Sequence, residues 1–393
     1  MDSIEFIHVL YYTTVWYFTF LILVWSTVLF YIGSGGQKLL HQHNSPSQVF
    51  AVALSLVVIW FLGLRPISGE FGDMWLYSLN FFGSDDAIYS SIQFGGEWLW
   101  RDLTIFCRRI GMNVHEYFLT IELGYVGFML AATWVLTRRN LWVGMLFFFV
   151  AFSFFSYGTN GIRNGLACSI ELLAIALCAK RGYERTFGLI LMFLAMGIHR
   201  STMLPSAAAF ATIYVIKDTK IALRFWLASI AISLVAGPYV EQLFSAIGFD
   251  DRMSSYSQSV LRGSDMFSHS GFRWDFLLYS SFPVAMIWYV TKIRRFSDVA
   301  YTMISNAYLL CNGFWIMVIR AAFSNRFAYL SWFIYPLVIF YPLLRMSIWK
   351  DQDRKTAIIL FLYSGFTFYM FFIYYFGTTG FKGFDQLWWK TAL

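Results

Sequence analysis

Runs of about 20 apolar residues recur along the chain, each long enough to cross a hydrocarbon core of about 30 Å as a helix. The chain has 393 residues, of which 59% are hydrophobic and only 13% are charged. A water-soluble domain of this length has too few interior positions to bury so much apolar surface. A helix satisfies its own backbone hydrogen bonds, which makes it a stable structure in lipid. The sequence therefore predicts a helical membrane protein.

The runs lack the strict alternation and short length of barrel strands, so we predict an all-α transmembrane bundle. We expect about 12 transmembrane helices in a single integral membrane domain over residues 1–393. Two long connections, 66–116 and 241–272, carry amphipathic aromatic stretches that we expect at the membrane surface. The stretch 186–216 is interrupted by polar residues and proline, and fits either two short helices or one broken helix. The expected spans are 9–32, 48–65, 117–136, 141–157, 162–179, 186–200, 203–216, 221–240, 273–291, 298–319, 327–345 and 356–376.

Basic residues cluster at every second tight connection between these spans. The clusters lie at 138–139, 180–185, 217–224, 292–295 and 345–355. Because short basic connections stay in the cytoplasm, we expect both termini and both long loops on the opposite side of the membrane. The formal net charge of +7 then reflects membrane topology and does not indicate nucleic-acid binding.

Ahead of the C-terminal tail, every basic residue that this topology places on the outer side is an arginine. They are Arg65, Arg101, Arg108, Arg109, Arg163, Arg200, Arg252, Arg262, Arg273, Arg320 and Arg326. Arginine keeps its charge at any relevant pH and offers a planar fork that binds phosphate through two hydrogen bonds. For the set we favour a phosphate-bearing ligand. The alternative is that each arginine extends to lipid headgroups or caps a helix.

Three segments carry candidate chemistry. After Arg65, the first outer loop supplies the carboxylates Glu70 and Asp73 in a glycine-containing turn, where either could act as a general base. Arg163 stands in the first turn of an expected helix, three residues after Asn160. A cation there opposes the helix dipole, so it predicts an anion bound jointly by the arginine and free backbone N–H groups.

The third segment places His199 beside Arg200 at the outer end of an expected helix. Histidine is the usual general base near neutral pH, although a lone membrane histidine more often packs helices together. Arg320 follows a long apolar helix, and Arg326 opens the next. Glu171 lies in the middle of a span and is interpreted as structural. No cysteine or histidine cluster has metal-ligand spacing, so we expect neither metal nor cofactor.

The order of these motifs resembles the EpsG family, which is related in role to the Wzy-type O-antigen and exopolysaccharide polymerases. The resemblance runs from about Leu62 to Tyr329 and rests mainly on Asn-Gly-Ile-Arg at 160–163 and His-Arg-Ser at 199–201. A late Arg-Phe at 326–327 adds to it. The chain departs from the family pattern in the first loop, where an acidic insertion containing Glu70 separates Arg65 from Asp73.

The resemblance implies a glycosyltransferase that polymerises lipid-linked oligosaccharide repeat units in a bundle related to the GT-C group. The growing glycan on undecaprenyl pyrophosphate would pass to a lipid-linked acceptor at the periplasmic face of a bacterial inner membrane, without metal. His199, Asp73 and Glu70 are then the candidate catalytic residues. Arg65, Asn160, Arg163, Arg200, Arg320 and Arg326 are the candidate substrate-binding residues. Membrane lipid, a flippase and a chain-length regulator are candidate partners.

Two other classes share some of these features. A transporter of lipid-linked oligosaccharides would also be polytopic and cationic, but it should show inverted repeats and charges near the midplane. A membrane acyltransferase that modifies a polysaccharide would also use histidine and arginine, but it should take its acyl donor from the cytoplasm. The polar residues of this chain gather mainly on one side, which favours the polymerase.

Overall fold

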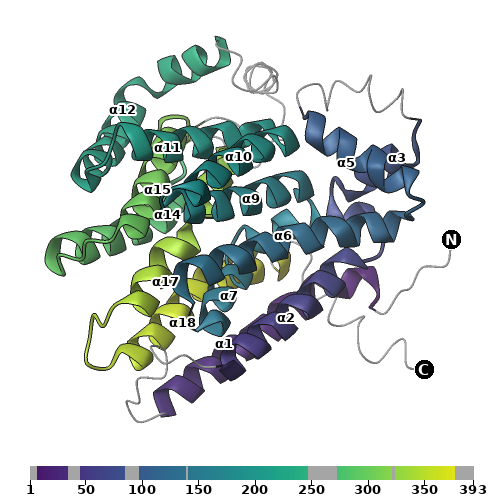
Figure 1. Ribbon diagram of the computed structural model, residues 1–393, viewed down its shortest axis with the longest axis horizontal. Helices are drawn as coiled ribbons and strands as arrows, with labels where there is room; N and C mark the ends of the chain where they lie inside the picture. Colours follow the sequence, from purple (N-terminus) through teal and green to yellow (C-terminus); the bar gives the residue numbers. More distant parts are fainter. Residues whose placement is uncertain are drawn as a thin grey trace. The chain divides into compact units, whose positions relative to one another are not determined.

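The computed structural model describes residues 7–33, 45–84, 97–138, 140–246, 272–320 and 324–376. Every regular element in these ranges is helical (Figure 1). Within them, seven helices have at least 18 residues and are apolar enough to cross a membrane. The structure thus confirms the predicted all-α, polytopic membrane fold. The stretch 247–271 of the second long loop lies outside the described residues, as do Arg139, Arg252 and Arg262.

The chain divides into two compact units. The first contains Met1–Ile170, Gly197–His199 and Leu343–Leu393, and the second contains Glu171–Met196 and Arg200–Pro342. Three helices continue from one unit into the other along the chain: α9, α10 and α17, which span Ile162–Cys178, Tyr183–Ile198 and Tyr335–Arg345.

The other helices of the first unit are α1 (Val9–Gly33), α2 (Ser45–Gly63), α3 (Met74–Phe82), α5 (Trp98–Arg109), α6 (Val114–Thr137), α7 (Leu141–Phe149), α8 (Phe154–Thr159) and α18 (Gln352–Met370). Helix α2 packs against α6 and α7, and α1 packs against α18 (Figure 1). The short helices α3 and α5 pack against each other and belong to the first long loop. This arrangement places the candidate residues of that loop beside the main helices of the unit.

Local capping explains where α6 begins. The side chain of Asn113 accepts hydrogen bonds from the backbone N–H groups of His115 and Glu116, at 2.9 and 3.0 Å. In return, the carboxylate of Glu116 accepts one from the N–H of Asn113 at 2.8 Å. This reciprocal pair satisfies donors that the first helical turn leaves without partners.

Helix α15 (Val299–Met317) packs against the other main helices of the second unit, namely α11 (Met203–Tyr214), α12 (Thr219–Ala246), α14 (Trp274–Trp288) and α16 (Ser324–Trp332). Its buried Asn312 accepts a hydrogen bond from the indole of Trp226 on α12 at 2.8 Å. The amide of Asn312 also donates to the hydroxyls of Ser280 and Ser331, at 3.2 and 2.9 Å. One buried polar side chain therefore connects four helices of this unit.

The structure differs from the expected spans at two places, and at a third it decides between two alternatives. The span expected at 141–157 consists of α7 and α8, and the span expected at 327–345 consists of α16 and α17. The stretch 186–216 contains α10 and α11, separated by a 3₁₀ turn at Arg200–Thr202, which is the two-helix alternative. Pro336 explains the break between α16 and α17, because proline has no N–H to donate to the carbonyl four residues earlier and is tolerated best in the first turn of a helix, where it lies in α17.

Candidate functional site

The loop after α2 lies close to the start of α9, where a glycine permits the approach and a hydrogen bond fixes it. Gly72 has a φ of +63°, and a Cβ atom at this position would come within 2.5 Å of the side chain of Asn160. The next residue, Asp73, donates its backbone N–H to the side-chain oxygen of Asn160 at 2.8 Å. Glycine tolerates both the left-handed backbone and the close approach. The structure thus places Asp73 beside Asn160, and it leaves Glu70 exposed on the same loop.

Arg163, in the first turn of α9, is buried and faces a carboxylate of the protein itself. Its guanidinium forms an ion pair with Glu97, which directly precedes α5. Its Nε donates a hydrogen bond to the hydroxyl oxygen of Tyr77 on α3 at 3.0 Å. The guanidinium carbon also lies 5.4 Å from the centre of the Tyr77 ring. The anion next to this cation in the structure is therefore the Glu97 carboxylate.

The same carboxylate contacts His199, just after the end of α10. Oε1 of Glu97 contacts Nδ1 of the imidazole, while Oε2 contacts Arg163. The side chain of His199 is 20% exposed, whereas those of Glu97 and Arg163 are 7% and 8% exposed. The histidine thus reaches the surface at the edge of a buried charged cluster. We name the four residues Tyr77, Glu97, Arg163 and His199 the outer cluster.

The approach of α5 to the end of α10 depends on Gly197. A Cβ atom at this position would lie 2.9 Å from the Trp98 indole and 3.0 Å from the Cβ of Leu99. Distances this short are not compatible with ordinary van der Waals contact. Because Glu97 is adjacent to Trp98, the absence of a side chain at 197 allows its carboxylate to meet His199 two residues further along.

Tyr77 completes the cluster as a neutral group. Burial raises the pKa of its phenol, because the charged form loses its hydration. The ring packs edge-on against Trp100 of α5, with ring centres 5.6 Å apart. A neutral phenol can accept the hydrogen bond from Arg163 and still donate its own proton.

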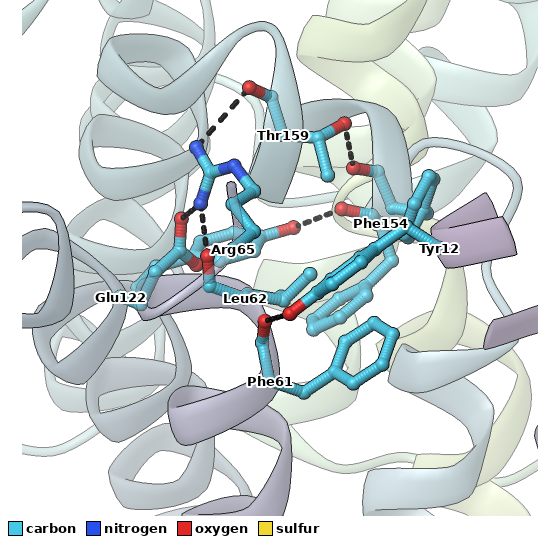
Figure 2. A network of polar contacts seen from close by, with 9 residues as sticks. Tyr12, Phe61, Leu62, Arg65, Glu122, Phe154 and Thr159 are labelled. Carbon is cyan, nitrogen blue, oxygen red and sulfur yellow. Dashed lines mark hydrogen bonds and ion pairs between the residues drawn. The ribbon is translucent and has the colours of Figure 1, made fainter. Parts of the chain in front are cut away.

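Arg65 lies in a separate buried network of the same unit (Figure 2). Its guanidinium is 3.3 Å from the carboxylate of Glu122 and donates to the carbonyl oxygen of Thr159 at 3.2 Å. A further hydrogen bond goes to the carbonyl oxygen of Leu62. The Arg65 side chain is completely buried, so its contacts here are with other groups of the protein. One of these groups, the carbonyl of Thr159, directly precedes Asn160 in the chain.

The remaining predicted arginines belong to the second unit. Arg200 is exposed in the 3₁₀ turn that follows His199. The guanidinium carbon of Arg320 lies 5.6 Å from the ring centre of Phe272. Arg326 lies in α16, and its side chain is outside the described part of the structure. The structure therefore brings together Arg163 and His199 in one cluster, and Asp73 and Asn160 in one hydrogen bond.

Sequence reasoning did not select Glu97 and Tyr77 as site residues. A signal for Tyr77 was present, since it lies four residues after Asp73 and hence on the same face of a helix. Glu97 carried a weaker signal, as an acidic residue at the start of an amphipathic helix on the expected outer side. Its partners lie 66 and 102 residues away in the chain, so no local pattern connects them.

The outer cluster combines an imidazole with a carboxylate and a guanidinium, which are the groups that move a proton and stabilise negative charge in group-transfer enzymes. Comparison with known proteins gives one family. No curated protein and no solved structure matches the chain. The model of the EpsG family matches residues 48–385, which is most of the chain and includes all four residues of the outer cluster. The chain belongs to the EpsG family, a family of Wzy-type polysaccharide polymerases in the membrane.

Proposed function

We infer that this protein polymerises repeat units linked to undecaprenyl pyrophosphate at the periplasmic face of a bacterial inner membrane. Family membership supports a membrane polysaccharide polymerase. The alternating basic connections support an outer position for the candidate residues. The single observation that carries the assignment of the site is the half-buried His199, in contact with a buried carboxylate next to Arg163.

The reaction transfers the growing glycan from its carrier lipid to the acceptor unit. A hydroxyl of the acceptor sugar attacks the anomeric carbon of the growing chain and forms the new glycosidic bond. The bond from that carbon to the pyrophosphate oxygen breaks, and undecaprenyl pyrophosphate leaves with the bonding electrons. The hydroxyl proton passes to a base, for which His199 is the first candidate and Asp73 and Glu70 are the others.

The leaving group accumulates negative charge as its bond breaks, and cations placed beside it lower the barrier. Arg163, Arg200, Arg320 and Arg326 are the candidates for this role, and Asn160 is a candidate for hydrogen bonding to substrate. The guanidinium fork suits pyrophosphate because it donates two parallel hydrogen bonds to neighbouring oxygens. Arg65 stays a predicted substrate ligand, although in this structure it is buried with Glu122.

The test uses purified full-length protein with a lipid-linked repeat unit, and measures the rate of polymer formation on gels. Loss of a general base costs about 10² to 10⁴ in rate, so His199→Ala should leave single repeat units and little polymer. His199→Gln separates two roles, because glutamine forms hydrogen bonds but does not take up a proton. A base predicts that the Gln variant is as inactive as Ala, and an orienting group predicts partial rescue.

His115→Gln is the matched control, since His115 lies in the same outer region at the start of α6 and outside the outer cluster. This variant should polymerise at the wild-type rate. If both His199 variants also do so, the histidine only packs helices, and Asp73 and Glu70 become the candidates for the base. Wild-type protein that moves the lipid-linked unit across a vesicle membrane without polymerising it would point instead to a transporter.

A further inference from the structure

Glu97 connects a candidate base to a buried cation, and neither the family match nor the motifs of the sequence assign it a role. We propose that Glu97 is a positioning residue, which fixes the orientation and the tautomer of His199 and is itself held by Arg163 and Tyr77. The proposal rests on the proposed function, because it concerns the base of that reaction. The outer cluster is then an ordered series, in which Tyr77 holds Arg163, Arg163 holds Glu97, and Glu97 orients His199.

The contact at Nδ1 determines which nitrogen of the imidazole is basic. A carboxylate only accepts hydrogen bonds, so the Nδ1 that contacts Glu97 carries the proton and Nε2 carries the lone pair. When Nε2 takes the proton of the acceptor hydroxyl, the imidazolium that forms lies directly beside the negative charge of Glu97. The carboxylate thus stabilises the charge that develops on His199 during the transfer.

Arg163 is the reason that Glu97 can be charged in a buried position. An isolated carboxylate loses its hydration on burial and is costly unless a cation and hydrogen bonds compensate. Here Oε2 contacts the guanidinium and Oε1 contacts the imidazole, so the carboxylate is shared between them. The Tyr77 hydroxyl accepts from Nε of the same guanidinium at 3.0 Å, which fixes the direction in which Arg163 points.

The same contacts fit a rival role for Glu97. Its carboxylate could be a stand-in that occupies the anion site of Arg163 until the substrate phosphate displaces it. The position of Glu97 in the chain favours positioning over displacement. It directly precedes α5, whose first residues Trp98 and Leu99 pack into the space that Gly197 leaves open, two residues before His199. The two roles predict different changes, since positioning affects kcat and displacement affects KM.

Glu97→Gln is the principal test, made on purified full-length protein with the lipid-linked repeat unit as substrate. A positioning carboxylate predicts that kcat falls by about 10² to 10⁴, as for loss of an orienting carboxylate elsewhere, with KM changed by less than about threefold. In a His199→Ala background the same substitution should cause no further loss, since Glu97 acts only through His199. Asp102→Asn, an exposed acid on the same helix, is the matched control and should leave both constants unchanged.

Three results would overturn the proposal. An unchanged kcat with a lower KM would identify Glu97 as the displaced stand-in. If Glu97→Gln lowers kcat as much in the His199→Ala background as in the wild type, Glu97 contributes to the rate independently of the histidine. A loss explained entirely by less folded protein, measured by thermal unfolding, would show a structural role. In each case wild-type polymerisation is unaffected, so the proposed function is judged separately by the activity of the unmodified protein.

Tyr77→Phe keeps the proposal testable if Glu97→Gln does not fold. It removes one oxygen atom and keeps the ring against Trp100, so it should fold as the wild type does. Losing the hydrogen bond to Arg163 should lower kcat by about tenfold, in line with a hydrogen bond to a charged group. In the His199→Ala background this loss should disappear. A Tyr77→Phe variant with wild-type kcat would contradict the ordered series.

Discussion

At the scale of single residues, Arg65 and Glu122 show how a charge can be kept inside this protein. The pair is completely buried, and among the described residues Nε of Arg65 and Oε2 of Glu122 have no hydrogen-bond partner. The rings of Phe71 and Phe118 lie 5.9 and 5.3 Å from the guanidinium carbon. A buried pair of this kind adds little net stability, but removing one partner leaves an uncompensated charge.

We therefore expect Glu122→Leu to destabilise the protein by about 3 to 5 kcal/mol, whereas Arg65→Met combined with Glu122→Leu should recover most of the loss. Thermal unfolding of the detergent-purified variants measures both effects. Asp102→Asn, which removes one partner of the exposed pair with Arg101, should change stability by less than about 1 kcal/mol. A double variant no more stable than the single one would show that the two charges are not coupled.

The double variant also separates the structural role of Arg65 from its predicted role in substrate binding. If the folded double variant polymerises normally, Arg65 serves only the fold. If it is folded and inactive, the guanidinium also acts on substrate. The same variant thus decides between two uses of one residue without relying on a poorly folded protein.

The sequence was sufficient to predict the kind of group that a residue would bind, but not which residue supplies that group. Arg163 was selected because a cation opposes the dipole at the start of a helix, and the structure places a carboxylate beside it. That this anion is Glu97 could not be predicted, because the pairing depends on how α3, α5 and the ends of α9 and α10 pack together. The substrate-binding roles of Arg163, Arg200, Arg320 and Arg326 stay predictions.

At the scale of helices, α5 is positioned by contacts that need a residue without a side chain. Gly197 lies in the last turn of α10, where glycine is normally less favourable than alanine in a helix. The cost is explained by the approach of Trp98 and Leu99, which leaves no space for a Cβ atom. A short amphipathic helix thereby becomes part of the site and not only a surface element.

Gly197→Val should push the first turn of α5 outward and separate Glu97 from His199. We expect a loss of polymerisation close to that of Glu97→Gln, of about 10² or more, with only part of it due to lower stability. The rate per folded molecule is the measurement. Gly127→Ala is the matched control, because a Cβ at this helical position meets nothing within 4 Å, and it should be neutral or slightly stabilising. Equal rates for the two variants would show that α5 need not lie close to α10.

The extent of the helices could be predicted only where the cause is local. The capping residues Asn113 and Asp298 mark the starts of α6 and α15 in the sequence, because each side chain accepts a nearby backbone N–H. Pro336 is likewise a local reason for the break before α17, although the expected span 327–345 ran through it. The end of α7 has no such signal, because the group that stabilises it comes from α18.

At the scale of the whole molecule, the apolar runs were sufficient to predict an all-α membrane protein, because helices are the structure available to such runs in lipid. The order of the motifs was sufficient to predict the family, which the match of the family model confirms. The division into two compact units was not visible in the sequence, since no linker or change of composition separates them. It arises from packing, in which three helices contribute residues to both units.

The orientation in the membrane is a prediction at this scale, and it rests on the alternating basic connections. Reporter fusions should be cytoplasmic after Arg139, Arg185, Lys220, Arg295 and Lys355, and external after Asp102, Gly263 and Phe384. The fusion after Asp102 is the most informative, because this residue lies five positions after Glu97. A cytoplasmic reporter there would place the outer cluster on the same side as the nucleotide-sugar pool and would contradict polymerisation at the periplasmic face.

The end of α7 has a consequence for the biogenesis of the protein. The carbonyl oxygen of Val150 accepts a hydrogen bond from the hydroxyl of Thr367 at 2.8 Å, and the two residues are 217 positions apart. Ribosomes add about 5 to 20 residues per second, so α18 emerges on the order of ten seconds or more after α7. During that interval the interrupted helix would expose an unsatisfied carbonyl to lipid, at a cost of several kcal/mol. We therefore expect the segment 141–159 to enter the bilayer before its native, interrupted helical form is stable. It should reach that form only after α18 has been synthesised and has packed beside it.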